Sequence, residues 1–169
     1  VLIFVMFFSV IGYGFVERDT ESIIIKKINY NGFEFTNQNG FWVTEIDGLQ
    51  FAFKNNPNEI EKIDSKVKGL ENYYEKPLYL FSENRDAEAE IYMNLNSISQ
   101  RVQKACPTGK KCDGDLPVKT CDNNNFIIIE ENETTEIRQD ENCVFIKGSK
   151  EKLTELSDVF LFKTLNIEQ

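Results

Sequence analysis

Three Asn-Gly or Asp-Gly pairs follow one another at intervals of eight residues: Asn31-Gly32, Asn39-Gly40 and Asp47-Gly48. Such pairs are typical of two-residue hairpin turns, because both positions of the turn need a positive φ. Short segments in which apolar and polar residues alternate lie between them, as in strands with one buried face. The spacing therefore predicts a four-stranded antiparallel β-meander over residues 23–53.

The segment after this meander carries the signals of a helix start. Asn56 can cap a helix, Pro57 suits its first turn, and Glu59 completes a capping box three residues after the cap. We therefore predict a helix over residues 57–68. Its narrow apolar stripe would consist of Ile60, Ile63 and Val67.

Strands and helices alternate in the second half of the predicted fold. The expected elements are a strand at 78–81, a helix at 86–105, strands at 126–129, 136–139 and 143–146, and a last helix that starts at 148–149. We further expect residues 126–131 and 134–139 to pair as a hairpin. The fold class is then α+β, with an antiparallel meander followed by a strand-helix-strands-helix unit.

Residues 1–16 contain no charged side chain and are almost wholly apolar, and acidic sequence starts at Glu17. Their length lies between that of a signal-peptide core and that of a full membrane span. We favour an N-terminal apolar helix that anchors the protein in a lipid bilayer, while a cleaved signal and a buried core helix stay open. The rest, 17–169, would be one extracytoplasmic α+β domain with a meander half (22–70) and a cysteine-containing half (77–169).

Four cysteines, all in the second half, point to disulfides rather than to a metal. The chain has no histidine and no Cys-x-x-Cys pair, so zinc sites and thioredoxin-like redox centres are poorly supported. An even number of cysteines behind a membrane-targeting segment favours two disulfides in an oxidising compartment. The expected hairpin would place Cys121 opposite Cys143, which leaves Cys106 to pair with Cys112, although all three possible pairings stay open.

The charge balance restricts the possible partners. A net charge of −9 and a pI near 4.7 argue against nucleic-acid binding, which needs clusters of Lys and Arg. A solvated acidic surface is the simplest interpretation. The chain has no Gly-rich phosphate loop and no Gly-Lys-Ser/Thr motif, so no nucleotide cofactor is expected.

Few residues are candidates for a chemical role. Without histidine, catalysis would depend on carboxylates, and Glu83 and Asp86 follow the strand at 78–81 at the end where α/β sheets often build sites. The simpler interpretation is that they favour the start of the next helix through its dipole. Asp113, Asp115 and Asp122 share one loop and are weak calcium candidates, since calcium needs six to eight oxygen ligands.

Two further residues have both a functional and a structural interpretation. Asn132-Glu133-Thr134 matches the N-glycosylation acceptor, and it lies at the tip of the expected hairpin, where it would be exposed. A plain turn is the alternative. Trp42, the only tryptophan, could belong to a binding face, but we favour a packed position under the helix expected at 57–68.

Four stretches carry a family resemblance: YNGFEF at 30–35, Trp42 after an Asn-Gly turn, NCVFIKG at 142–148 and DVFLFKTLNI at 158–167. Together they resemble small membrane-anchored proteins predicted from archaeal genomes. The resemblance implies an anchor and an extracytoplasmic domain, and it assigns neither an activity nor a catalytic residue.

These observations lead to a functional hypothesis. The anchor, the even cysteine count and the lack of a recognisable catalytic set favour a binding or envelope-interaction module, with a protein or envelope component as partner, over an enzyme. One alternative is a histidine-free hydrolase that uses carboxylates, which would need a cleft with converging acids of perturbed pKa. The other is a structural subunit of a surface assembly, as in pilin-like proteins.

Overall fold

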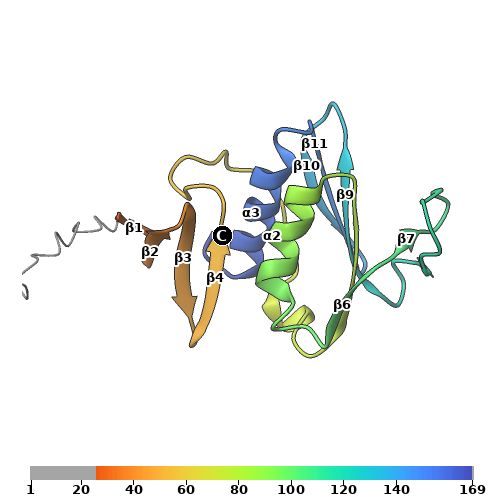
Figure 1. The fold of residues 1–169 in the computed structure, drawn as a ribbon, viewed down its shortest axis with the longest axis horizontal. Helices are drawn as coiled ribbons and strands as arrows, with labels where there is room; N and C mark the ends of the chain where they lie inside the picture. The colour runs from red at the N-terminus through yellow and green to blue at the C-terminus, as the bar shows by residue number, and fades with distance from the viewer. Residues whose placement is uncertain (1–25, 169) are drawn as a thin grey trace, which may run out of the picture.

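Residues 26–168 are described by a computed structural model, so the apolar segment 1–16 and its expected anchor helix lie outside the described residues. The fold has three layers, in which two helices lie between a four-stranded sheet and a five-stranded sheet (Figure 1). The elements are β1 (Lys27–Tyr30), β2 (Phe33–Gln38), β3 (Phe41–Ile46), β4 (Leu49–Phe53), η2 (Leu70–Asn72), β5 (Pro77–Ser82), α2 (Arg85–Leu95), β6 (Arg101–Lys104), β7 (Cys106–Pro107), β8 (Val118–Lys119), β9 (Asn125–Glu131), β10 (Glu136–Asp140), β11 (Cys143–Gly148) and α3 (Leu153–Thr164).

The predicted antiparallel meander is confirmed as β1-β2-β3-β4. Both residues of each predicted turn have positive φ, for example 50° at Asn31 and 87° at Gly32, as a two-residue hairpin turn requires. Alternate side chains face the helices, and the buried ones are mostly aromatic. They are Tyr30, Phe35, Trp42, Thr44, Phe51 and Phe53.

The helix predicted at 57–68 does not form, because only one turn follows Asn56. The backbone N–H of Glu59 donates to the Asn56 carbonyl oxygen at 2.9 Å, and the Asn56 side chain accepts from the Asn58 N–H at 3.0 Å rather than from that of Glu59. After Ile60 the chain is irregular, and Ile63 and Val67 are half-buried. Ile60, Ile63 and Val67 pack against the core from this irregular segment, so contact with the core overrides the weak helical pattern.

The helix predicted at 86–105 is correct only in its first half, since α2 ends at Leu95 and β6 begins at Arg101. Asn and Ser dominate residues 96–99, and these residue types favour turns over helix interiors. Val102 then faces Leu78 of β5 in a parallel pair instead of continuing a helical stripe.

The five-stranded sheet has the order β10-β11-β9-β5-β6. The hairpin expected between residues 126–131 and 134–139 is wrong, because β9 lies between two parallel neighbours, β5 and β11. The antiparallel partner of β10 is β11. The short connection from β9 to β10 passes the end of β11, where the Asn132 N–H donates to the Gly148 carbonyl oxygen at 2.8 Å.

Helix α3 lies in the middle layer and is buried over nearly its whole length. Its Phe162 ring packs on the meander, 4.6 Å from the Phe53 ring centroid and 6.1 Å from that of Phe35. A helix that is buried on all sides carries few polar residues. The buried carboxylate of Asp158 is therefore unexpected at this position.

A cysteine-containing loop covers the outer face of the five-stranded sheet. Both predicted disulfides are present, Cys106–Cys112 and Cys121–Cys143, so the pairing ranked first is correct. The hairpin of 126–131 with 134–139, from which this pairing was inferred, does not form, so another contact brings Cys121 to Cys143. Cys121 lies beside the start of β11, where its carbonyl oxygen accepts from the Asn142 N–H at 3.2 Å. Beneath this loop a second cluster packs, formed by Tyr79, Ala105, Phe126, Ile128 and Cys143.

Candidate binding site

The chain changes direction between the neighbouring strands β5 and β9. From β5 it continues through α2 to β6 on one side of the sheet, whereas β9 lies on the other side and has β11 beyond it. In open α/β sheets, a ligand commonly binds in the crevice at the carboxyl ends of two such strands. Glu83 directly follows β5, and Glu130 and Glu131 close β9, so these acids lie at the carboxyl ends of the two strands.

Glu83 joins the two strand ends. Its backbone N–H donates to the Ile129 carbonyl oxygen at 3.1 Å, and its Oε2 accepts from the Glu131 N–H at 2.9 Å. Its Oε1 accepts from Nζ of Lys110 at 2.7 Å. Lys110 also reaches Glu130 at 2.8 Å, so one ammonium group neutralises two carboxylates.

These contacts determine the charge states at the crevice. Burial alone would raise the pKa of Glu83, but the hydrogen bonds from Lys110 and from the Glu131 N–H outweigh it and lower the pKa below its ordinary value. Burial disfavours the charged form of Lys110, and its two carboxylate partners reverse this and raise its pKa. Glu83 is therefore a fixed carboxylate at neutral pH and a poor proton donor.

The disulfide Cys106–Cys112 closes the small loop that carries Lys110 to the strand ends. This loop and the adjoining residues enclose a cavity of about 440 Å³. We name this cavity the crevice. Its lining is Leu80, Phe81, Ser82, Glu83, Glu88, Lys104, Ala105, Lys110, Lys111, Cys112, Asp113 and Leu116. Within it, Lys104 pairs with Glu88 at 2.7 Å, and Nζ of Lys110 lies 4.5 Å from the centre of the Phe81 ring.

Asp86, which the sequence analysis grouped with Glu83, lines a different cavity. The side chain of Asn84 caps α2, because it accepts from the N–H groups of Asp86 and Ala87 at 3.0 Å each. Asp86 lies in the first turn, where a negative charge is favourable. Glu83 is thus brought to the crevice, and Asp86 is not.

The three weak calcium candidates are exposed, and they do not form a common site. Asp113 borders the crevice, whereas Asp122 lies beside Glu141, whose pKa it raises through a hydrogen bond and like charge. In residues 26–168 no group of three or more acidic or cysteine side chains is arranged to hold a metal ion.

Asn132 is exposed in the connection between β9 and β10. Its Oδ1 accepts from the Thr134 N–H at 2.9 Å and from the Thr134 hydroxyl at 2.7 Å. The acceptor sequence is thus accessible, and its glycosylation stays a prediction. Trp42 is buried in the main core cluster, which supports a structural role, although the helix expected to cover it at 57–68 does not form.

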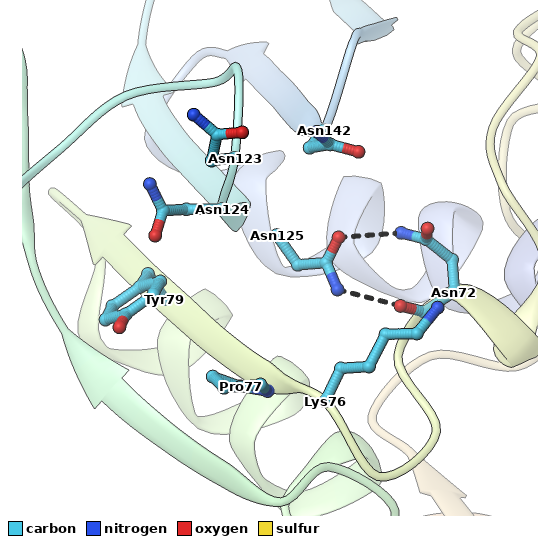
Figure 2. Close-up of a pocket in the computed structure, with 8 residues that line it drawn as sticks. All are labelled: Asn72, Lys76, Pro77, Tyr79, Asn123, Asn124, Asn125 and Asn142. Carbon is cyan, nitrogen blue, oxygen red and sulfur yellow. Dashed lines mark hydrogen bonds between the residues drawn. The ribbon is translucent and has the colours of Figure 1, made fainter.

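A second cavity, of about 300 Å³, lies at the opposite ends of β5 and β9 and is rich in asparagine (Figure 2). Asn72 and Asn125 bond to each other twice, since the Asn72 amide donates to Oδ1 of Asn125 at 3.1 Å and the Asn125 amide donates to the Asn72 carbonyl oxygen at 2.7 Å. Asn142 donates to the Asp122 carbonyl oxygen at 2.8 Å. Because these amides join loops, the cavity is better explained as a structural junction.

The residues that the sequence analysis missed are Glu90 and Asp158. Both side chains are buried, at 3% and 0% exposure, and Glu90 borders a cavity of about 400 Å³ between the meander and the two helices. Burial raises the pKa of both carboxyls. One signal was available: Glu90 and Asn94 occupy the same helical face as Ala87 and Ile91, where apolar residues are expected.

No protein-family model, curated protein or solved structure matches this chain. Neither helix in the described part of the chain, α2 or α3, is long and apolar enough to cross a membrane. The two disulfides indicate an oxidising compartment, and so a domain outside the cytoplasm.

Proposed function

We propose that the protein is an extracytoplasmic binding module, anchored in the membrane by residues 1–16, whose crevice holds a small ligand that bears both a positive and a negative charge. An amino acid or a short peptide of the cell envelope has this chemistry. The anchor is supported by the uncharged apolar stretch before Glu17.

The observation that carries this proposal is that the charged groups at the strand ends are held in place and neutralised. The Glu83 carboxylate accepts two hydrogen bonds, from Lys110 and from the Glu131 N–H, and Lys110 spans two carboxylates. Because its pKa is lowered, Glu83 is ionised near neutral pH and cannot donate a proton. Positive and negative groups held in fixed positions are suited to binding a charged ligand.

The lining of the crevice supports a zwitterionic ligand. Lys104 and Lys111 present ammonium groups, and Glu88 and Asp113 present carboxylates. The Lys104–Glu88 pair is partly open to solvent, so each partner can exchange its contact for one with a ligand at little cost. Leu80, Phe81 and Leu116 supply apolar surface for the uncharged part of the ligand.

A carboxylate hydrolase is the second candidate, and the observation that favours it is the pair of Glu90 and Asp158, whose pKa values are raised next to a cavity. Their unpartnered oxygens, Oε2 of Glu90 and Oδ1 of Asp158, are closed off from solvent. A hydrolytic pair must reach water and substrate, so this geometry supports binding over hydrolysis.

The experiment is a titration of the full chain in detergent micelles with a mixture of L-amino acids and dipeptides, followed through the backbone amide resonances by NMR. We expect shifts at residues 81–83 and 104–113 and none at the asparagine-rich cavity. Leu116→Trp, which fills the crevice, should weaken binding at least tenfold, since a blocked cavity cannot admit the ligand.

Val118→Trp is the matched control, because Val118 lies on the same loop with 64% of its surface exposed and does not line the crevice. It should bind like the unaltered protein. Shifts confined to other surfaces, or equal binding by the two tryptophan variants, would contradict the proposed site.

A further inference from the structure

Two carboxyl groups meet in the middle layer of the molecule, where few charges are expected. Asp158 projects from α3 and Glu90 from α2, and the two carboxyls are buried at 0% and 3% exposure, each with one oxygen that has no hydrogen-bond partner: Oδ1 of Asp158 and Oε2 of Glu90. Two ionised carboxylates cannot bond to each other, because each then has only acceptor oxygens. A single proton between them would give both oxygens a partner.

The remaining contacts agree with a single proton. Oδ2 of Asp158 accepts from both the backbone N–H and the side-chain amide of Asn55, at 2.9 Å each. Oδ1 of Asp158 and Oε2 of Glu90 are buried, and neither has a hydrogen-bond donor within residues 26–168. A proton on Glu90 that is donated to Asp158 satisfies both oxygens at once, whereas two bare carboxylates would repel each other at low dielectric.

One neighbouring charge favours the protonated form, since Glu155 on α3 disfavours a further negative charge at Asp158. Asp86 on α2 and the exposed Glu151 just before α3 border the same cavity, and Lys54 is its one cation. Lys54 opposes the effect only in part. Burial and the Asp158 charge raise the pKa of Glu90 to about 9, and burial raises that of Asp158 above its usual range despite the donors from Asn55.

We propose that the proton shared by Glu90 and Asp158 is a pH-sensitive latch, which joins α2 to α3 and, through Asn55, to the end of the meander, and which is released as the pH rises. Because Asn55 comes two residues after β4, loss of the proton would loosen the contact between the meander and the helices. The latch lies apart from the crevice and does not depend on the proposed function.

The direction of the pH effect follows from linkage. A folded-state pKa above the unfolded value means that the folded protein keeps a proton that the unfolded chain releases. The stabilisation is fully present below the unfolded pKa of Glu, about 4.3. It is lost progressively up to about pH 9, where Glu90 ionises in the folded protein.

The test is the free energy of unfolding of the full chain in micelles, measured by denaturant titration from pH 5 to pH 9. The unaltered protein should become less stable as the pH rises. Glu90→Gln keeps a permanent donor to Asp158, so it should remove at least half of this pH dependence. Glu151→Gln is the matched control, because Glu151 is exposed at the same cavity and its loss should leave the dependence unchanged.

Parallel pH profiles for the unaltered protein and Glu90→Gln would overturn the proposal. If Glu90→Gln does not fold, the side-chain carboxyl carbon of Glu90 is observed by NMR in the unaltered protein. A protonated chemical shift at pH 7 supports the latch, and a carboxylate shift at that pH refutes it.

Discussion

The side-chain amide of Asn94 in α2 hydrogen-bonds to the backbone of Ala52 in β4, which is an edge strand of the meander. Its Oδ1 accepts from the Ala52 N–H at 2.9 Å and its Nδ2 donates to the Ala52 carbonyl oxygen at 2.8 Å, so it bonds to β4 as a neighbouring strand would. The same Nδ2 donates to the Glu90 carbonyl oxygen at 2.9 Å. One side chain thus attaches α2 to the sheet and protects an edge that could otherwise pair with another chain.

Asn94→Ala should lower the free energy of unfolding by about 2 kcal/mol, because it leaves backbone groups of Ala52 without partners at a partly buried position. Asn96→Ala, at the exposed end of the same helix, should change stability by less than about 0.5 kcal/mol. Denaturant titration of both variants measures the difference. Equal losses would show that the contact to β4 contributes little.

At the scale of the elements, strands and turns could be predicted where the local sequence allows only one backbone conformation. The three turns at Asn31, Asn39 and Asp47 require a backbone conformation that few residues adopt, so the meander could be predicted. The turn between β10 and β11 is Glu141-Asn142, which has no such signature, although Glu141 has a φ of 50°. The sequence therefore offered no local signal for the hairpin of β10 with β11, and the expected pairing of 126–131 with 134–139 is wrong.

Where the local sequence signals were weak, contacts with the rest of the fold determined whether a segment became a helix, a strand or an irregular stretch. Ile60, Ile63 and Val67 lie at helical spacing, but the pattern is short, and the segment is irregular where it contacts the core. The same holds for Val102, whose place in β6 depends on the neighbouring strand β5. A single sequence does not contain this information.

The two disulfides make different contributions at this scale. Cys121–Cys143 spans 22 residues and ties the covering loop to β11, whereas Cys106–Cys112 spans only 6. On loop entropy, replacing the first pair with Ser should cost about 3 kcal/mol of unfolding free energy and replacing the second about 2 kcal/mol. Denaturant titration without reductant tests this order.

Removal of Cys121–Cys143 should also increase the binding of a dye that reports apolar surface, because Tyr79, Phe126 and Ile128 lie under the loop. Removal of Cys106–Cys112 should leave this signal unchanged and instead release Lys110 from the crevice. The reverse pattern would mean that the loop is held down by its other contacts.

At the scale of the whole molecule, the candidate site could be predicted only in part. The position of Glu83 after a buried strand indicated the crevice, but its partner Lys110 comes from a loop whose course depends on a disulfide. The pair of Glu90 and Asp158 required knowledge that α2 and α3 are neighbours in the middle layer. Contacts between distant segments carry no signature within either segment.

The central claim is that the folded protein carries both disulfides and therefore occupies an oxidising compartment. The most direct measurement is the intact mass of the protein purified from its native source, with thiols blocked, before and after reduction. We expect a mass four hydrogens lighter before reduction than after it, since each of the two disulfides removes two hydrogens. Four blocked thiols without reduction would contradict the presence of the two disulfides.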